Sequence, residues 1–139
     1  MIIYCTGSKR GDAAHKKLQK DIIDFAESLG HTVLAELSDK FRSTIPLTDN
    51  QIYKRSLKWI DGSKLVLAEV SESNSETGFE IAYALFERKI PTLVLHKGNA
   101  RISSILSGCD SPLLTIQKYN DPDEMKSIIQ TFINKIDNS

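Results

Sequence analysis

Residues 65–68 (LVLA) constrain the fold more than any other stretch, because they are apolar throughout and show no polar–apolar alternation. Such a run is typical of a strand that is covered on both faces, as in a parallel sheet. Val70 extends the run past Glu69, and a serine-rich polar loop follows. Apolar residues at three- and four-residue steps then indicate a helix, namely Phe79, Ala82, Tyr83 and Phe86. Residues 64–89 are therefore predicted to form a strand, a loop and a helix.

Glu80 is the main candidate functional residue of this unit. It falls in the first turns of the predicted helix, on the apolar side between Phe79 and Tyr83. A carboxylate in that position is costly unless it is paired or used. Loops that follow the strands of an open α/β sheet are also where ligands bind. The alternative is an ordinary helix carboxylate, partly solvated and favoured by the helix dipole.

The rest of the chain alternates strands and helices. Further strands are predicted at residues 1–6, 32–36, 90–95 and 113–117, and helices at 14–29, 52–60 and 101–107. Asp121-Pro122 predicts the N-cap and first residue of a last helix. Right-handed crossovers then give an α/β fold, a single domain spanning 1–139. We expect a doubly wound, flavodoxin- or Rossmann-like, five-stranded parallel sheet with helices on both faces.

Charge and cysteine usage limit the partners. Eighteen basic and eighteen acidic residues cancel, which argues against non-specific binding to nucleic acid or membranes and favours a small-molecule partner. Cys5 and Cys109 are isolated, with no Cys/His cluster at ligand spacing, so we expect no metal and a reduced cytoplasmic protein. The apolar start of the chain is too short for a secretion signal, and no stretch approaches a membrane span.

The loop at residues 7–12 (GSKRGD) comes between the first strand and the first helix. Backbone N–H groups and the helix dipole hold anions at such positions, and Ser8, Lys9 and Arg10 add donors. The loop is neither a Walker A motif nor a complete dinucleotide fingerprint, so a glycine turn with solvated charges is the alternative. Its strand is expected to neighbour the strand before Ser71, which brings both loops to one edge of the sheet.

Three motifs in matching order resemble the nucleoside 2-deoxyribosyltransferase family. They are IYCTGSKRG at 3–11, WI at 59–60 before LVLAEVS at 65–71, and TGFEIAYA at 77–84. The resemblance extends from residue 1 to about 107 and is greatest to the 2′-deoxynucleoside 5′-phosphate N-hydrolase branch. Three separated motifs in register are far more specific than any one of them.

The resemblance implies N-glycosidic chemistry without a cofactor. Glu80 would attack C1′ of a nucleotide and expel the base, and water would then resolve the glycosyl-enzyme. Tyr4 would lie near the nucleophile and the sugar, and Ser56 takes the position of a catalytic aspartate of the family. Ser104 matches a serine that a neighbouring subunit offers to the 5′-phosphate, which implies a homodimer. The residues expected to bind substrate are Gly7, Ser8, Arg10, Gly11, Ser71, Asn74, Gly78 and Ser104.

Two positions depart from the family pattern. Ser56 replaces the aspartate that supports the nucleophile and the leaving group, and Asn74 stands where phosphate hydrolases carry serine and transferases carry an acid. A neutral Asn74 favours a phosphorylated substrate, although Glu72 and Glu76 flank it. We predict a nucleotide N-glycosidase; the alternatives are a deoxyribosyltransferase, a catalytically weak nucleotide-binding protein, or a flavodoxin-like regulatory domain.

Overall fold

A parallel sheet with the strand order β2-β1-β3-β4-β5 forms the centre of the computed structural model, which describes residues 1–8, 11–41 and 43–138. Its strands are β1 (Ile2–Gly7), β2 (Thr32–Leu34), β3 (Leu65–Glu69), β4 (Thr92–Lys97) and β5 (Leu114–Tyr119). Every pairing between neighbouring strands is parallel. This is the flavodoxin-like order of a doubly wound sheet, so the predicted fold class is confirmed.

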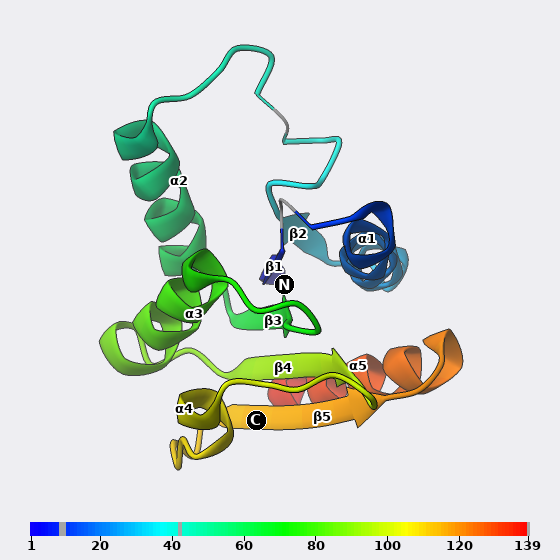
Figure 1. The fold of residues 1–139 in the computed structure, drawn as a ribbon. Coiled ribbons are helices and arrows are strands. Elements are labelled where there is room, and N and C mark those ends of the chain that lie inside the picture. The colour runs from blue at the N-terminus through cyan, green and yellow to red at the C-terminus, as the bar shows by residue number, and fades with distance from the viewer. Residues whose placement is uncertain (9–10, 42, 139) are drawn as a thin grey trace.

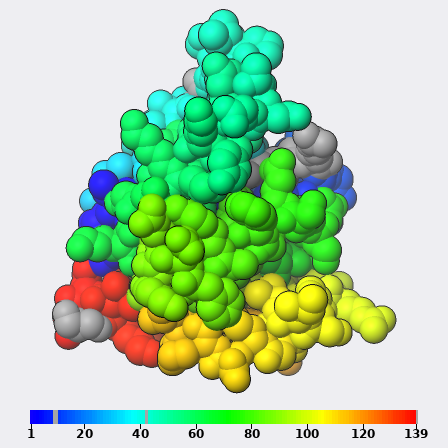
Figure 2. All heavy atoms as spheres, turned by 90° about the vertical axis from the view of Figure 1, so that its left-hand side faces the viewer, coloured from blue at the N-terminus to red at the C-terminus, as the bar shows by residue number. Residues whose placement is uncertain are grey.

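Helices cover both faces of the sheet, as Figure 1 shows. Helices α1 (Ala13–Ser28) and α5 (Pro122–Asp137) pack on one face, where the largest hydrophobic cluster lies. The other face carries α2 (Asp49–Asp61), α3 (Ser75–Ala82), the π-helix η1 (Tyr83–Glu87) and the short α4 (Ser104–Ser107). In Figure 2, α3 and η1 occupy the middle of this second face, below α2 and above the segment that contains α4.

Strand β3 explains why the LVLA run shows no alternation. All five of its residues are buried, with Leu65 and Leu67 in the cluster under α1 and α5. Val66 packs with Tyr4 and Ala68 with Ile81, in the clusters of the opposite face. A strand covered on both sides has no solvent face that would need polar residues.

The helix ends follow from local chemistry. Gly30 lies just past α1 with φ of +92°, a conformation that glycine adopts readily. The predicted N-cap of the last helix is confirmed, because the Asp121 side chain accepts from Glu124 N at 2.8 Å. Helix α2 begins earlier than the predicted residue 52, because Thr48 and Gln51 form a capping box. That earlier start places Asp49 in its first turn.

The apolar stripe of the central helix is not the face that packs on the sheet. Phe79 is 57% exposed and Phe86 is 56% exposed, whereas Thr77, Glu80 and Ile81 are buried. The two phenylalanines instead line hollows on either side of α3. The periodicity therefore identified the helix correctly, but the stripe contributes walls of cavities. No helix in the described part of the chain combines the length and apolarity that a bilayer crossing requires.

Candidate active site

A buried carboxylate, Glu80, is held by two hydroxyl groups of strand β1. Thr6 Oγ1 donates to Glu80 Oε1 at 2.7 Å, and Tyr4 Oη donates to Glu80 Oε2. Tyr4 and Thr6 lie two residues apart, so their side chains share one face of the sheet. Glu80 is 4% exposed, yet it lines an open groove. Strand β1 and helix α3 therefore fix the orientation of a carboxylate that a ligand can reach.

The surroundings of Tyr4 keep its phenol protonated. Burial raises the pKa of Tyr4 well above its ordinary value, and the charge of Glu80 and their hydrogen bond raise it further. A hydrogen bond with Ser56 acts in the opposite direction. Because the phenol holds its proton, Tyr4 is a permanent hydrogen-bond donor to Glu80. The same arrangement joins the three predicted catalytic residues, Glu80, Tyr4 and Ser56.

The groove beside Glu80 runs between α2 and α3 and has a volume of about 380 Å³. We call it the α2–α3 groove. Helix α2 contributes Asp49, Tyr53 and Ser56 to its wall, with Ile52 and Leu57, and α3 contributes Ser75, Glu76, Phe79 and Glu80. The spacing along each helix is three or four residues, so one face of each helix forms the wall.

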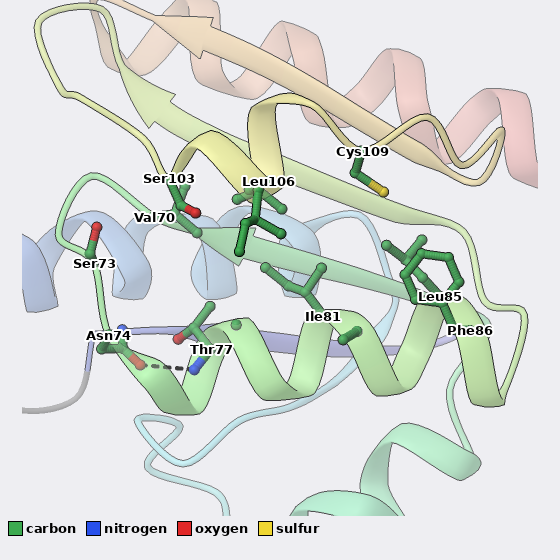
Figure 3. Close-up of a pocket in the computed structure, with 13 residues that line it drawn as sticks. Val70, Ser73, Asn74, Thr77, Ile81, Leu85, Phe86, Ser103, Leu106 and Cys109 are labelled. Atoms are coloured by element: carbon green, nitrogen blue, oxygen red, sulfur yellow. Dashed lines mark hydrogen bonds between the residues drawn. The ribbon is translucent and has the colours of Figure 1, made fainter.

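A second cavity, of about 330 Å³, lies on the other side of α3 (Figure 3). We call it the α3–α4 cavity, because Ile81 and Leu85 lie across it from Leu106 and Cys109. It is mainly apolar and carries less polar surface than the α2–α3 groove. Two predicted substrate-binding residues, Asn74 and Gly78, line this cavity rather than the groove that holds Ser56.

Asn74 caps α3 through its side-chain oxygen, and its side-chain nitrogen is left without a hydrogen-bond partner among the described residues. Its Oδ1 accepts from Thr77 N at 2.8 Å, as Figure 3 shows. Its Nδ2 is buried and has no hydrogen-bond partner among the described residues, and the same holds for Thr77 Oγ1. Buried polar groups are normally paired, so two unpaired groups at one helix start indicate a place where a ligand completes the bonding.

The first loop contacts the loop before α3 through Glu72. Ser8 Oγ donates to Glu72 Oε1, and an added Cβ at Gly11 would come within 2.5 Å of the same oxygen. His15 Nδ1 lies 3.6 Å from Glu72 Oε2. Gly7 is the last residue of β1. The two predicted loops therefore do converge, but the Ser8 hydroxyl donates to the Glu72 carboxylate and not to a ligand. Arg10, also predicted to bind substrate, lies outside the described residues.

Ser71 belongs to a different network from the other predicted site residues. Its N–H and its hydroxyl donate to Glu69 at 2.7 and 2.9 Å, and its oxygen accepts from Lys97 N at 2.8 Å. Tyr119 Oη also donates to Glu69. Ser104 is the first residue of α4 and is exposed, next to Ile105, which is 88% exposed. Both residues therefore lie apart from Glu80.

Sequence reasoning missed Thr6 and Asp49. Alternation along β1 was the available signal for Thr6, since a residue two positions after Tyr4 shares its face. The capping box at Thr48 and Gln51 was the signal that would have placed Asp49 on α2. Among the described residues, no group of three His, Cys, Asp or Glu side chains has an arrangement that could hold a metal ion.

Known proteins resemble the chain in both sequence and fold. No family model matches it. It is 33% identical over 134 residues to the "Putative 2'-deoxynucleoside 5'-phosphate N-hydrolase 1" of Methanosarcina mazei, with 94% of this chain and 83% of the relative covered. The match covers most of both proteins.

Two solved structures share the fold at 17% identity. The CMP N-glycosidase BcmB of Clostridium botulinum gives a TM-score of 0.70 over 95% of this chain and 99% of its own. A 2-deoxyribosyltransferase of Bacillus psychrosaccharolyticus gives 0.69 over 91% of this chain and 90% of its own. The likeness therefore covers the whole architecture of sheet and helices.

Proposed function

Because the chain belongs to the 2′-deoxynucleoside 5′-phosphate N-hydrolase family, we propose that it is an enzyme that hydrolyses the N-glycosidic bond of a nucleoside 5′-monophosphate. The observation that carries this proposal is the buried Glu80 carboxylate, oriented by Tyr4 and Thr6 at the wall of the α2–α3 groove. A carboxylate fixed by two donors and reachable from a groove has the properties of a nucleophile.

In the proposed reaction, a Glu80 oxygen attacks C1′ of the bound nucleotide. The bond from C1′ to the base nitrogen breaks, and the base leaves with that electron pair. The product is a glycosyl ester on Glu80, which water hydrolyses to regenerate the carboxylate. Tyr4 and Thr6 hold the Glu80 side chain in place during both steps, because each donates a hydrogen bond to one of its oxygens.

Ser56 cannot protonate the leaving base as an aspartate would, because the pKa of a hydroxyl lies far above neutrality. The raised pKa of Tyr4 also makes that phenol a poor acid. The base therefore takes its proton from water or leaves unassisted. Such an enzyme is slow, and a nucleotide-binding protein with little turnover is the second candidate that Ser56 favours.

We propose that the 5′-phosphate binds between the first loop and the start of α3. The unpaired Asn74 Nδ2 is buried at the start of α3. The family resemblance implies that Gly7, Ser8, Arg10 and Gly11 would supply backbone and side-chain donors. Charge-assisted bonds of this kind favour monophosphates over nucleosides. We give Ser71 a structural role instead, because its hydroxyl is bonded to Glu69.

We also propose that the protein works as a homodimer in the cytoplasm. Ile105 and Phe86 place exposed apolar surface beside the α3–α4 cavity, which a second copy would cover. Ser104 on α4 would then reach into the site of the neighbouring subunit. There it would lie near the bound phosphate and Gly78. Cys5 and Cys109 are not joined in a disulfide, which fits a reducing compartment.

The test is base release from a panel of ribo- and deoxyribonucleoside monophosphates, followed by chromatography. We expect Glu80→Gln to abolish release and to change nucleotide affinity by less than about tenfold, or 1.4 kcal/mol. Glu87→Gln is the matched control, since Glu87 is exposed and lies seven residues further along the same helical segment.

Three outcomes separate the candidates. Full turnover in Glu80→Gln would remove Glu80 from the mechanism. Nucleotide binding without base release by the unaltered protein would favour the second candidate. A monophosphate that binds no better than its nucleoside at low salt would contradict the phosphate site.

A further inference from the structure

The α2–α3 groove has three levels between its floor and its mouth. Glu80 and Ser56 form the floor, where they are 4% and 7% exposed. Tyr53 and Phe79 form the middle level, and they are half exposed, with ring centroids 6.4 Å apart at 65°. Asp49 and Ser75 begin the two helices and lie at the mouth. In α2 the three levels follow the helical spacing of three or four residues, from Ser56 through Tyr53 to Asp49. In α3, Phe79 and Glu80 are neighbours in the sequence, and Ser75 lies four residues before Phe79.

The direction of the base follows from the displacement at C1′, so this inference rests on the proposed function. An attacking oxygen and a leaving nitrogen lie on opposite sides of the carbon that is attacked. With Glu80 at the floor, the base extends away from the floor and toward the mouth. It would then lie beside the faces of Tyr53 and Phe79, which supply flat apolar surface for a nucleobase.

Asp49 lies where the far edge of that base would end. It precedes Ser56 by seven residues, which is about 10 Å along the axis of α2. That distance is too long for Asp49 to protonate the nitrogen at C1′, so it does not replace the missing aspartate. It is long enough to place the carboxylate at the opposite edge of the base.

The capping bonds of α2 do not involve the Asp49 carboxylate, which contributes only a first-turn charge that the helix dipole favours. The capping bonds of α2 come from Thr48 and Gln51, and Asp49 is exposed, with no side-chain hydrogen bond or ion pair to the described residues. The described residues that line the groove include three carboxylates, on Asp49, Glu76 and Glu80, and no cationic side chain. The charged groups of the described lining are therefore all acceptors, and they lie beside aromatic walls and the hydroxyls of Tyr53, Ser56 and Ser75.

We propose that Asp49 selects nucleobases that carry an amino group on their far edge. An ionised carboxylate only accepts hydrogen bonds, so it pairs with the exocyclic amine of cytosine or adenine. The carbonyl of uracil or hypoxanthine in the same place would meet the carboxylate with its own lone pairs. Sites that bond a donor reject analogues that lack it more strongly than apolar pockets reject a methylene.

The experiment compares dCMP with dUMP and dAMP with dIMP, pairs in which a carbonyl replaces the amino group and the adjacent ring nitrogen gains a proton. The readout is the ratio of kcat/KM within each pair. We expect the unaltered enzyme to prefer the amino member by about tenfold, because one charge-assisted bond is involved. In Asp49→Asn the ratio should fall close to one, since an amide both donates and accepts. Asp123→Asn is the control, because Asp123 is also an exposed first-turn carboxylate, on α5.

A binding measurement separates this inference from the proposed function. The same four nucleotides are titrated calorimetrically into Glu80→Gln and into Glu80→Gln/Asp49→Asn. A preference for the amino members that disappears with Asp49→Asn supports the inference even if the unaltered protein releases no base. Base release with equal kcat/KM within each pair overturns it and leaves the proposed function standing. A preference that survives Asp49→Asn overturns the role of Asp49.

Discussion

Two buried glutamates, Glu80 and Glu69, are alike in partners and different in access. Each accepts from a tyrosine and from a second hydroxyl: Tyr4 and Thr6 for Glu80, Tyr119 and Ser71 for Glu69. Glu69 is 3% exposed and takes a third bond from Ser71 N, whereas Glu80 borders the α2–α3 groove. Burial and a tyrosine partner therefore do not identify a catalytic carboxylate. What distinguishes Glu80, the proposed nucleophile, is its place on the wall of the groove.

The largest expected effect separates the two glutamates by stability. Glu69→Ala leaves the hydroxyls of Tyr119 and Ser71 and one N–H buried without an acceptor, and should cost about 3 kcal/mol of unfolding free energy. Glu80→Ala should cost about 1 kcal/mol, because water entering the groove hydrates the hydroxyls of Tyr4 and Thr6. Urea denaturation measures both. Equal losses would mean that Glu80 is as structural as Glu69.

Ser56→Asp would place a second carboxylate in the groove that holds Glu80, a change with no counterpart at Glu69. If the missing acid limits the reaction, kcat should rise by about 10²-fold while nucleotide affinity stays nearly unchanged. Ser56→Asn is the matched control, since it adds similar volume without an ionisable group. A fall in the activity of an already fast enzyme would show that the serine serves a different mechanism, and that the family's chemistry does not transfer to this position.

Unfolding at alkaline pH tests the hydrogen bond between Tyr119 and Glu69. Burial, helped by the bond to Glu69, raises the pKa of Tyr119 above its ordinary value of 10.0. The stabilisation is therefore complete below pH 10 and is lost as the pH rises further, since the unfolded chain releases the proton first. The loss approaches about 1.4 kcal/mol per pH unit for each such group.

Urea midpoints between pH 8 and 11.5 give the measurement. Tyr119→Phe should be less stable at neutral pH but should decline less steeply above pH 10. Tyr53→Phe, which removes an exposed hydroxyl, should keep the decline of the unaltered protein. Parallel declines in all three proteins would exclude Tyr119 as a source of the pH dependence.

The smallest expected effect concerns Glu72, whose side chain is 39% exposed and accepts from Ser8. It is far more exposed than Glu69 or Glu80. A phosphate at the first loop must displace this carboxylate, so Glu72→Gln should tighten monophosphate binding by about threefold. Nucleoside affinity serves as the internal control and should not change. Weaker monophosphate binding would mean that Glu72 organises the loop for the ligand.

Local patterns carried most of the fold prediction. The LVLA run identified a doubly covered strand, and Asp121-Pro122 identified a helix start, because both depend on neighbouring residues alone. The position of Glu80 also followed from its helix. Phe79 shows the limit of this reasoning, since periodicity says which residues share a face but not what covers that face.

Contacts between distant segments could not be predicted. Ser71 looked like a ligand-binding serine, but its role depends on Tyr119, which bonds the same Glu69 from 50 residues away. Ser8 likewise meets Glu72 across 64 residues. Only the completed sheet brings these partners together. The contact between Tyr4 and Glu80 is the exception, because the resemblance to a known family implied that these two residues lie close together.

The bond between Tyr4 and Glu80 joins residues 76 positions apart and attaches the first strand of the chain to α3, the helix that carries the proposed nucleophile. Strand β1 lies between β2 and β3, so it pairs on both sides only after later segments have been synthesised and folded. A nascent or partly unfolded chain would hold Glu80 without its orienting phenol. Nucleotide turnover would then report complete assembly of the domain, and a nucleotide that binds the assembled form would oppose detachment of β1 by mass action.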